Sequence, residues 1–193
     1  MNSKLIFKYG TMGCGKTLNL ITTSYSYEEH GKKTIIFKPA LDNRDGNNII
    51  KSRTGFQKEV ILISENDNIF DITSDIIKNG RIHCVLVDEA QFLKKHHIFQ
   101  LSNIVDKLNI TVIAYGLRSD FKLNSFEGSN QLMVMADLEE IKTICSECGE
   151  RKASVNARYS DNKIVIKGQQ IQLGGNESYK PLCRKCYKDL TNN

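Results

Sequence analysis

Eight residues near the N-terminus constrain this chain more than any other feature: Gly10-Thr11-Met12-Gly13-Cys14-Gly15-Lys16-Thr17. They match the G-x-x-x-x-G-K-[ST] pattern, follow the apolar run Leu5–Tyr9 and precede a helix-like segment, as a phosphate-binding loop requires. The glycines let backbone N–H groups point toward phosphate oxygens, and the helix N-terminus adds partial positive charge. All eight residues are therefore predicted to bind ATP. We expect Lys16 to reach its β- and γ-phosphates and the Thr17 hydroxyl to help hold Mg²⁺.

A second motif is an apolar strand that ends in carboxylates, Val85-Leu86-Val87-Asp88-Glu89-Ala90-Gln91-Phe92. Asp88 at the end of the strand suits the shell of a magnesium ion, and Glu89 beside it is available as a base. Acidic pairs at strand ends are often only solvated. After a phosphate-binding loop we favour the functional interpretation, in which Asp88, Glu89, Ala90 and Gln91 belong to the nucleotide site.

Short apolar runs alternate with helix-like segments between Lys4 and about Tyr115. The expected strands are Leu5–Tyr9, Thr34–Lys38, Glu59–Ile63, His83–Val87 and Thr111–Tyr115, and the expected helices are Lys16–His30, Ile69–Lys78 and His97–Leu108. This order predicts an α/β fold of the P-loop (RecA-like) class, with a mostly parallel sheet covered by helices on both faces.

Two segments of the core are expected to be loops. Pro39–Lys58 is polar and long, which indicates a mobile functional loop. Gly116–Ser129 is expected to follow the last strand of the core. Beyond Ile144 the helical periodicity stops, and Lys163–Lys167 and Gln170–Leu173 alternate like the two arms of a β-ribbon.

The cysteines add a metal site to this picture. Cys145, Cys148, Cys183 and Cys186 form two C-x-x-C pairs with 34 residues between them. Four thiolates make a closed tetrahedral zinc site without an open position for catalysis, and disulfides or free thiols are the alternatives. The metal would close a long loop. We therefore predict a P-loop domain over 1–143 and a zinc-binding domain over 144–193. For Cys14 a small residue tolerated in the loop is favoured over a nucleophile.

The composition narrows the class of protein. Hydrophobic residues make up 40% and charged residues 25% of the 193-residue chain, as in globular and not in disordered proteins. The net charge of +5 suits polyphosphate ligands and nucleic acid equally. No stretch approaches the roughly 18 to 20 apolar residues of a membrane helix, and Leu5–Tyr9 is too short for a secretory signal. We therefore expect a cytoplasmic protein without a membrane partner.

Together these motifs resemble the type II thymidine kinase family over nearly the whole chain. Further similar stretches are Lys38-Pro39-Ala40-Leu41-Asp42-Asn43-Arg44, Tyr115-Gly116-Leu117-Arg118-Ser119-Asp120-Phe121 and Gly174-Gly175-Asn176-Glu177-Ser178-Tyr179 ahead of Cys183-Arg184. The resemblance implies transfer of the γ-phosphoryl group of ATP to the 5′-hydroxyl of thymidine. It also implies a homotetramer and feedback inhibition by the triphosphate end product.

The same resemblance implies the roles of individual residues. Glu89 would be the general base, and Arg44 would steady the transferring phosphoryl group with Asp42 nearby. The segment between the cysteine pairs would close over the substrate as a lasso, binding thymine through backbone groups around Gln172, with Tyr179 closing over it. The base pocket would be lined by Met12, Phe92, Leu117 and Phe121.

Some positions depart from the family pattern. Thr11, Gly13 and Cys14 differ from the usual loop, but the lysine, the hydroxyl and the closing glycine are kept. Asn156 stands where many members have a threonine near the base, which leaves the fine specificity open. Arg158 falls near a family arginine, and the sequence assigns it no role.

Two other functions are compatible with parts of the sequence. A nucleic-acid-dependent ATPase could carry the Asp88-Glu89 box, but such motors generally need two core domains or a ring, and no basic segment with interleaved aromatics is present. A zinc module that binds nucleic acid or protein, with a vestigial nucleotide site, would not need an intact Lys16 and Thr17. We therefore expect thymidine and ATP, and not nucleic acid, as partners.

Overall fold

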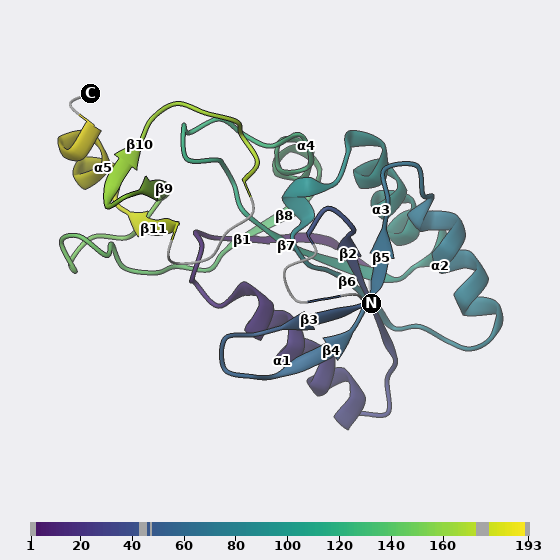
Figure 1. The fold of residues 1–193 in the computed structure, drawn as a ribbon. Helices are drawn as coiled ribbons and strands as arrows, with labels where there is room; N and C mark the ends of the chain where they lie inside the picture. The colour runs from purple at the N-terminus through teal and green to yellow at the C-terminus, as the bar shows by residue number, and fades with distance from the viewer. Residues whose placement is uncertain (1–2, 43–45, 47, 173–177, 192–193) are drawn as a thin grey trace.

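A parallel sheet forms the centre of the computed structural model, which describes residues 3–42, 46, 48–172 and 178–191 (Figure 1). The elements are β1 (Leu5–Tyr9), α1 (Lys16–Glu29), β2 (Thr34–Pro39), β3 (Ile49–Lys51), β4 (Gln57–Glu59), β5 (Ile61–Ile63), α2 (Ile69–Lys78), β6 (Cys84–Val87), the 3₁₀ turn η1 (Ala90–Phe92), α3 (Lys95–Leu108), β7 (Thr111–Gly116), α4 (Glu127–Met135), β8 (Asp137–Glu140), β9 (Val155–Ser160), β10 (Lys163–Val165), β11 (Tyr179–Leu182) and α5 (Arg184–Thr191). The central sheet has the order β5-β2-β6-β7-β1-β8, and every neighbouring pair is parallel. This confirms the predicted α/β fold.

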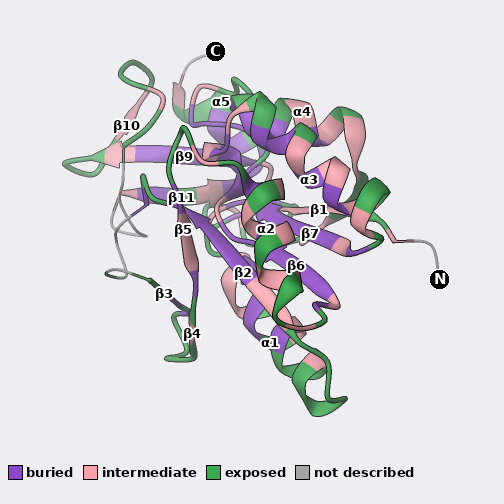
Figure 2. Cartoon of the chain, turned by 90° about the vertical axis from the view of Figure 1, so that its right-hand side faces the viewer, coloured by how far each residue is buried: buried purple, intermediate pink, exposed green. Residues whose placement is uncertain are grey.

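Both faces of the sheet are buried under helices, which explains the uninterrupted apolar strands. In β6 all four residues are buried, and Figure 2 shows the same for most of β7. Val85 and Val87 pack into the cluster under α2, α3 and α4, whereas Cys84 and Leu86 pack toward α1. A strand with two buried faces has no polar side and therefore no alternation.

The parallel arrangement brings the two sequence motifs together. β1 pairs with β7, and β7 pairs with β6, so the carboxyl ends of these strands meet at one edge of the sheet. The phosphate-loop motif follows β1 and Asp88 follows β6. Ligand sites of open parallel sheets lie at this edge.

The C-terminal segment forms a small lobe with its own sheet and apolar cluster. β9 pairs antiparallel with β10 on one side and with β11 on the other. Val155, Ala157 and Leu182 pack with the cysteines and Tyr187. The Tyr187 hydroxyl donates to the Phe121 carbonyl at 2.8 Å, which ties this lobe to the loop after β7.

Several sequence predictions for the core were wrong. Within Pro39–Lys58, described except at 43–45 and 47, β3 and β4 form an antiparallel hairpin held to the core by the fully buried Ile50. The expected strand Glu59–Ile63 is divided at Val60, because Glu59 pairs within the hairpin and Ile61 pairs with Phe37 in the central sheet.

The end of the core and the lobe also differ from expectation. Gly116–Ser129 does not follow the last core strand, since α4 and then β8 follow, and β8 pairs with β1 at the edge of the sheet. The expected arm Gln170–Leu173 is not a strand in its described part, residues 170–172. β10 pairs with β9 instead, and the helix α5 follows Cys183.

Candidate active site

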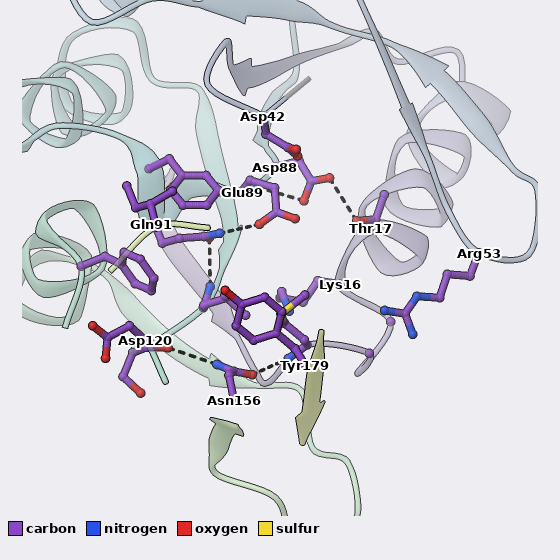
Figure 3. A pocket seen from close by; sticks show the side chains of 18 of the residues that line it. Lys16, Thr17, Asp42, Arg53, Asp88, Glu89, Gln91, Asp120, Asn156 and Tyr179 are labelled. Atoms are coloured by element: carbon purple, nitrogen blue, oxygen red, sulfur yellow. Dashed lines mark hydrogen bonds between the residues drawn. The ribbon is translucent and has the colours of Figure 1, made fainter. Parts of the chain in front are cut away.

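A cavity of about 480 Å³ opens at the carboxyl ends of β1, β6 and β7 (Figure 3). Its lining combines the phosphate loop, the ends of β6 and β7, the β3–β4 hairpin and the C-terminal lobe: Met12, Gly13, Gly15, Lys16, Thr17, Leu18, Asp42, Lys51, Ser52, Arg53, Thr54, Asp88, Glu89, Gln91, Phe92, Leu117, Ser119, Asp120, Phe121, Phe126, Asn156, Gln170, Ile171, Gln172 and Tyr179. Segments far apart in the sequence therefore enclose one space.

The phosphate loop leads into α1 through a left-handed residue. Gly15 has a φ of +84°, which side chains other than glycine rarely adopt, and α1 starts at Lys16. The Lys16 ammonium donates to the Thr11 carbonyl at 2.8 Å, and this bond holds the side chain against the loop. The N-terminus of α1 and the Lys16 charge thus lie together, an arrangement suited to phosphate oxygens.

Two carboxylates follow β6 and have different environments. Asp88 is buried and its Oδ2 accepts a hydrogen bond from the Thr17 hydroxyl at 3.0 Å. Burial, with the neighbouring Glu89 carboxylate as the second cause, raises the pKa of Asp88 to about 7. Glu89 is half-buried and its backbone is left-handed, with φ 48°. A non-glycine residue in this conformation is strained, and such residues cluster at functional sites.

In protein free of nucleotide and metal, Asp88→Asn is expected to raise thermal stability, and the gain should grow with pH. The folded state raises this pKa from 3.8 to about 7, so it binds more protons than the unfolded state, and wild-type stability falls as the pH rises between these values. The gain grows by at most about 1.4 kcal/mol per pH unit and levels off above the folded pKa. Melting curves from about pH 5 to about pH 8 measure it. A gain independent of pH would contradict this origin.

Gln91, which the sequence assigns to the nucleotide site, lines the cavity and forms a hydrogen bond with Glu89. The Gln91 amide donates to Glu89 Oε2 and its oxygen accepts from the Leu117 N–H at 3.0 Å. Gln91 is itself buried. It therefore connects the carboxylate to the end of β7 and limits its rotation.

An apolar wall completes the part of the cavity beyond Glu89. Phe92 and Phe126 meet edge to face with ring centroids 5.9 Å apart, and the buried Leu117 and Phe121 line the same cavity. Met12 lines the same cavity from the phosphate loop. All four residues predicted to line the base pocket therefore line this one cavity. Phe126, which was not predicted, lines it as well.

Arg158 organises the segment that crosses the cavity. Its guanidinium lies 3.8 Å from the centre of the Phe121 ring and donates to the carbonyls of Gln169 and Gln170, at 2.9 and 3.2 Å. It also donates to the Tyr179 hydroxyl, which in turn donates to the Gln172 carbonyl, both at 2.9 Å. The Tyr179 hydroxyl, and not its ring alone, therefore orders this segment.

The four paired cysteines converge in the C-terminal lobe. The sulfur atoms of Cys145, Cys148, Cys183 and Cys186 all lie within 4.8 Å of one another, and all six cysteines of the chain are without disulfides. Four thiolates bound to zinc at about 2.3 Å would lie about 3.8 Å apart in a tetrahedron. The Cys186 N–H also donates to the Cys183 sulfur at 3.4 Å, which orients that sulfur. The cluster therefore fits a tetrahedral metal ion such as zinc.

The chain is similar to known proteins over nearly its whole length. A family model described as thymidine kinase matches residues 3–187. The chain belongs to the thymidine kinase family. Proteins named thymidine kinase from Streptococcus pyogenes serotype M3, Enterococcus faecalis and Lactiplantibacillus plantarum are each 46% identical over 186 residues, which cover 96% of this chain. The matches cover 97%, 94% and 95% of these relatives, respectively.

In this member of the thymidine kinase family, Asn156 links the two parts of the site. Its side-chain oxygen accepts from the Met12 N–H at 2.7 Å, and its amide nitrogen donates to the Ser119 carbonyl at 3.1 Å. Asn156 itself is buried, and its bond to the Ser119 carbonyl is shielded from water. The lobe that carries Tyr179 is thereby attached directly to the phosphate loop.

Some predicted residues lie elsewhere. Gly10, Thr11, Cys14 and Ala90 are outside the cavity lining, and Ala90 packs in the core under the helices. Arg44 lies outside the described residues. Asp42 lines the cavity and pairs with the buried Lys38 at 3.3 Å.

Sequence reasoning missed the hairpin, and it named Asn156 and Arg158 of the lobe without their contacts. Ser52, Arg53 and Thr54 reach the cavity from a segment expected to be an irregular loop. Gly55 follows the polar residues 52–54 and lies between the two short segments that form β3 and β4. This pattern was the available signal for a hairpin turn. Asn156 and Arg158 carry no local signal, because their positions depend on the pairing of β9 with β11.

Proposed function

We propose that this chain uses ATP to phosphorylate the 5′-hydroxyl of thymidine, giving dTMP for DNA precursor synthesis. The observation that carries the proposal is the composition of one cavity. Phosphate-loop residues line one part of it, aromatic and aliphatic side chains line another, and Glu89 lies between them (Figure 3). A nucleotide and a nucleoside bound in this cavity would meet at Glu89.

The reaction forms a bond from the 5′-oxygen to the γ-phosphorus, breaks the bond to the β–γ bridging oxygen and releases one proton. Glu89 would accept that proton, with its carboxylate oriented by Gln91. Lys16 and the N–H groups of the loop would neutralise phosphate oxygens, and this charge neutralisation supplies most of the catalysis in phosphoryl transfer. By the family resemblance, Arg44 would stabilise the transferring group with Asp42 nearby.

Two metal ions belong to the proposal. Thr17 and Asp88 present two oxygens, 3.0 Å apart, as ligands for Mg²⁺, which would neutralise charge on the β- and γ-phosphates when bound. The four cysteines would hold zinc in a closed site with a structural and not a catalytic role. The family resemblance adds a homotetramer in the cytoplasm, acting on free nucleosides and not on nucleic acid.

Thymine would lie against the apolar wall, with its polar edge toward the backbone of Gln170–Gln172. Ile171 and Gln172 line the cavity beside Tyr179. Backbone N–H and C=O groups match the O4 and N3–H edge of thymine, whereas cytosine presents a donor where thymine has an acceptor. A buried polar mismatch of this kind discriminates far more strongly than a missing methyl group.

A panel of nucleosides tests the proposal and its specificity. With ATP and Mg²⁺, thymidine should be phosphorylated several orders of magnitude better than deoxycytidine or any purine nucleoside, while deoxyuridine is accepted about 10- to 200-fold less well. Chromatography of the monophosphates formed provides the measurement. Preferred phosphorylation of deoxycytidine or deoxyguanosine would overturn the specificity. ATP hydrolysis that depends on DNA, without any monophosphate, would overturn the function and favour a nucleic-acid-dependent ATPase.

A further inference from the structure

The β3–β4 hairpin ends in a tight turn that its sequence favours. The Ser52 N–H donates to the Phe56 carbonyl at 2.8 Å, and the Gly55 N–H donates to the Ser52 carbonyl at 3.0 Å. Gly55 has a φ of +92°, the left-handed position of a three-residue hairpin loop. The hydroxyls of Ser52 and Thr54 lie 2.9 Å apart and brace the turn. Arg53 therefore projects from a fixed backbone.

The hairpin is attached to the helix that begins at the phosphate loop. Ile50 of β3 is fully buried in a cluster with Leu20 of α1. The Lys58 ammonium of β4 lies 2.6 Å from the Glu28 carboxylate near the end of the same helix. Since α1 begins at Lys16, these contacts fix the turn relative to the phosphate loop.

Arg53 lines the cavity with a charge that none of the described residues pairs with. It lines the cavity together with Gly13, Lys16 and Thr17, and it is exposed. Across residues 3–42, 46, 48–172 and 178–191 its guanidinium has no hydrogen bond or ion pair, whereas Lys16 donates to Thr11. Figure 3 shows the Arg53 side chain extended from the hairpin toward the phosphate loop.

We propose that Arg53 binds the polyphosphate chain of the nucleoside triphosphate, as a second cation beside Lys16. The inference deepens the proposed function and rests on it, since it assumes that ATP occupies the cavity. A guanidinium suits this ligand because it stays charged and offers N–H donors in a planar fork that matches two phosphate oxygens. Because the turn already fixes the backbone, only the Arg53 side chain has to be ordered when the phosphates bind.

The test uses Arg53→Ala, Arg53→Lys and the control Arg81→Ala, which removes an exposed arginine away from the cavity lining. Equilibrium binding of ATP with Mg²⁺, of inorganic tripolyphosphate and of thymidine is measured separately. Arg53→Ala should weaken ATP and tripolyphosphate binding about tenfold or more, and Arg53→Lys less, because lysine keeps the charge without the fork. Thymidine binding and the melting temperature should stay unchanged in all three variants.

Unchanged ATP binding in Arg53→Ala would overturn the proposal, as would an equal loss in Arg81→Ala or a parallel loss of thymidine binding. Weaker ATP binding with normal tripolyphosphate binding would also overturn it, because the contact would then be with the nucleoside part. None of these measurements requires turnover. A wild-type chain that binds ATP but does not phosphorylate thymidine would refute the proposed function and leave the result for Arg53 interpretable.

Discussion

Glu89→Gln is expected to lower kcat for thymidine phosphorylation by about 10² to 10⁴, with the Kd for thymidine little changed. Glutamine keeps the shape of the side chain and can still hydrogen-bond, but it cannot accept the proton of the 5′-hydroxyl. The Gln91 amide that donates to Glu89 can donate to the new amide oxygen, so the local structure should persist. Steady-state kinetics together with thymidine binding measure the two quantities.

The control for this change is Glu65→Gln, which makes the same chemical change in a surface pair with Lys94. It should leave kcat unchanged. Lys16→Ala provides the contrast, because in the proposed function Lys16 would face the phosphates in both the ground and the transition state. Its loss should weaken ATP binding as well as turnover. Near-normal turnover in Glu89→Gln would mean that another group is the base, and Asp42 would be the next candidate.

Cys183→Ser is expected to release the metal, disorder the C-terminal lobe and weaken thymidine binding by about tenfold or more, while ATP binding persists. Cys183 follows β11, in which Tyr179 lies opposite Arg158 and Pro181 lies opposite Asn156 of β9. A metal ion bound by the four cysteines would thus hold together the two strands that carry these side chains to the cavity. The phosphate loop depends on β1 and α1 instead, which lie outside the lobe.

Metal content by elemental analysis, hydrogen exchange of the lobe and separate binding of the two substrates measure these effects. Cys84→Ala is the matched control, since it removes a thiol outside the cysteine cluster and should keep one metal ion per chain. The zinc site would be contradicted if wild-type protein, purified without any chelator, contained no metal. Retained thymidine binding in Cys183→Ser would instead separate the metal from the substrate site.

Elements with a strong local pattern could be predicted from the sequence. The bounds of β1 and α2 coincide with the predicted ones. The side chain of Asn68, just before α2, accepts hydrogen bonds from the N–H groups of Phe70 and Asp71. This helix cap involves only neighbouring residues, so the sequence can show it. The phosphate loop and the cysteine pairs are equally local, since their spacing alone carries the signal.

The missed elements either depend on a partner elsewhere in the chain or are too short to show a pattern. β8 reads Asp137-Leu138-Glu139-Glu140, a composition that is poor for strands, and it is extended because its backbone pairs with β1. The strands of the hairpin have three residues each, too few for a periodicity to show. The predicted ribbon arm near Gln170 is instead held by the guanidinium of Arg158.

The residues of the candidate site also differ in whether their sequence signal is local. Lys16, Thr17, Asp88 and Glu89 could be found because phosphate chemistry requires these residue types directly after strands. The contacts of Asn156 with Met12 and of Arg158 with Tyr179 could not, since they join positions 144 and 21 residues apart. The first contact depends on how the lobe sits on the core and the second on the pairing of β9 with β11, and a single sequence carries no pattern for either.

The left-handed backbone of Glu89 creates a trade-off between the thermal stability of this enzyme and the presence of its carboxylate. Holding a residue other than glycine at a φ of 48° costs about 1 to 3 kcal/mol. Glycine or asparagine at position 89 would relieve that cost. Repeated laboratory selection for heat resistance alone would therefore favour loss of the carboxylate, and only a selection that also demands growth on thymidine would retain it.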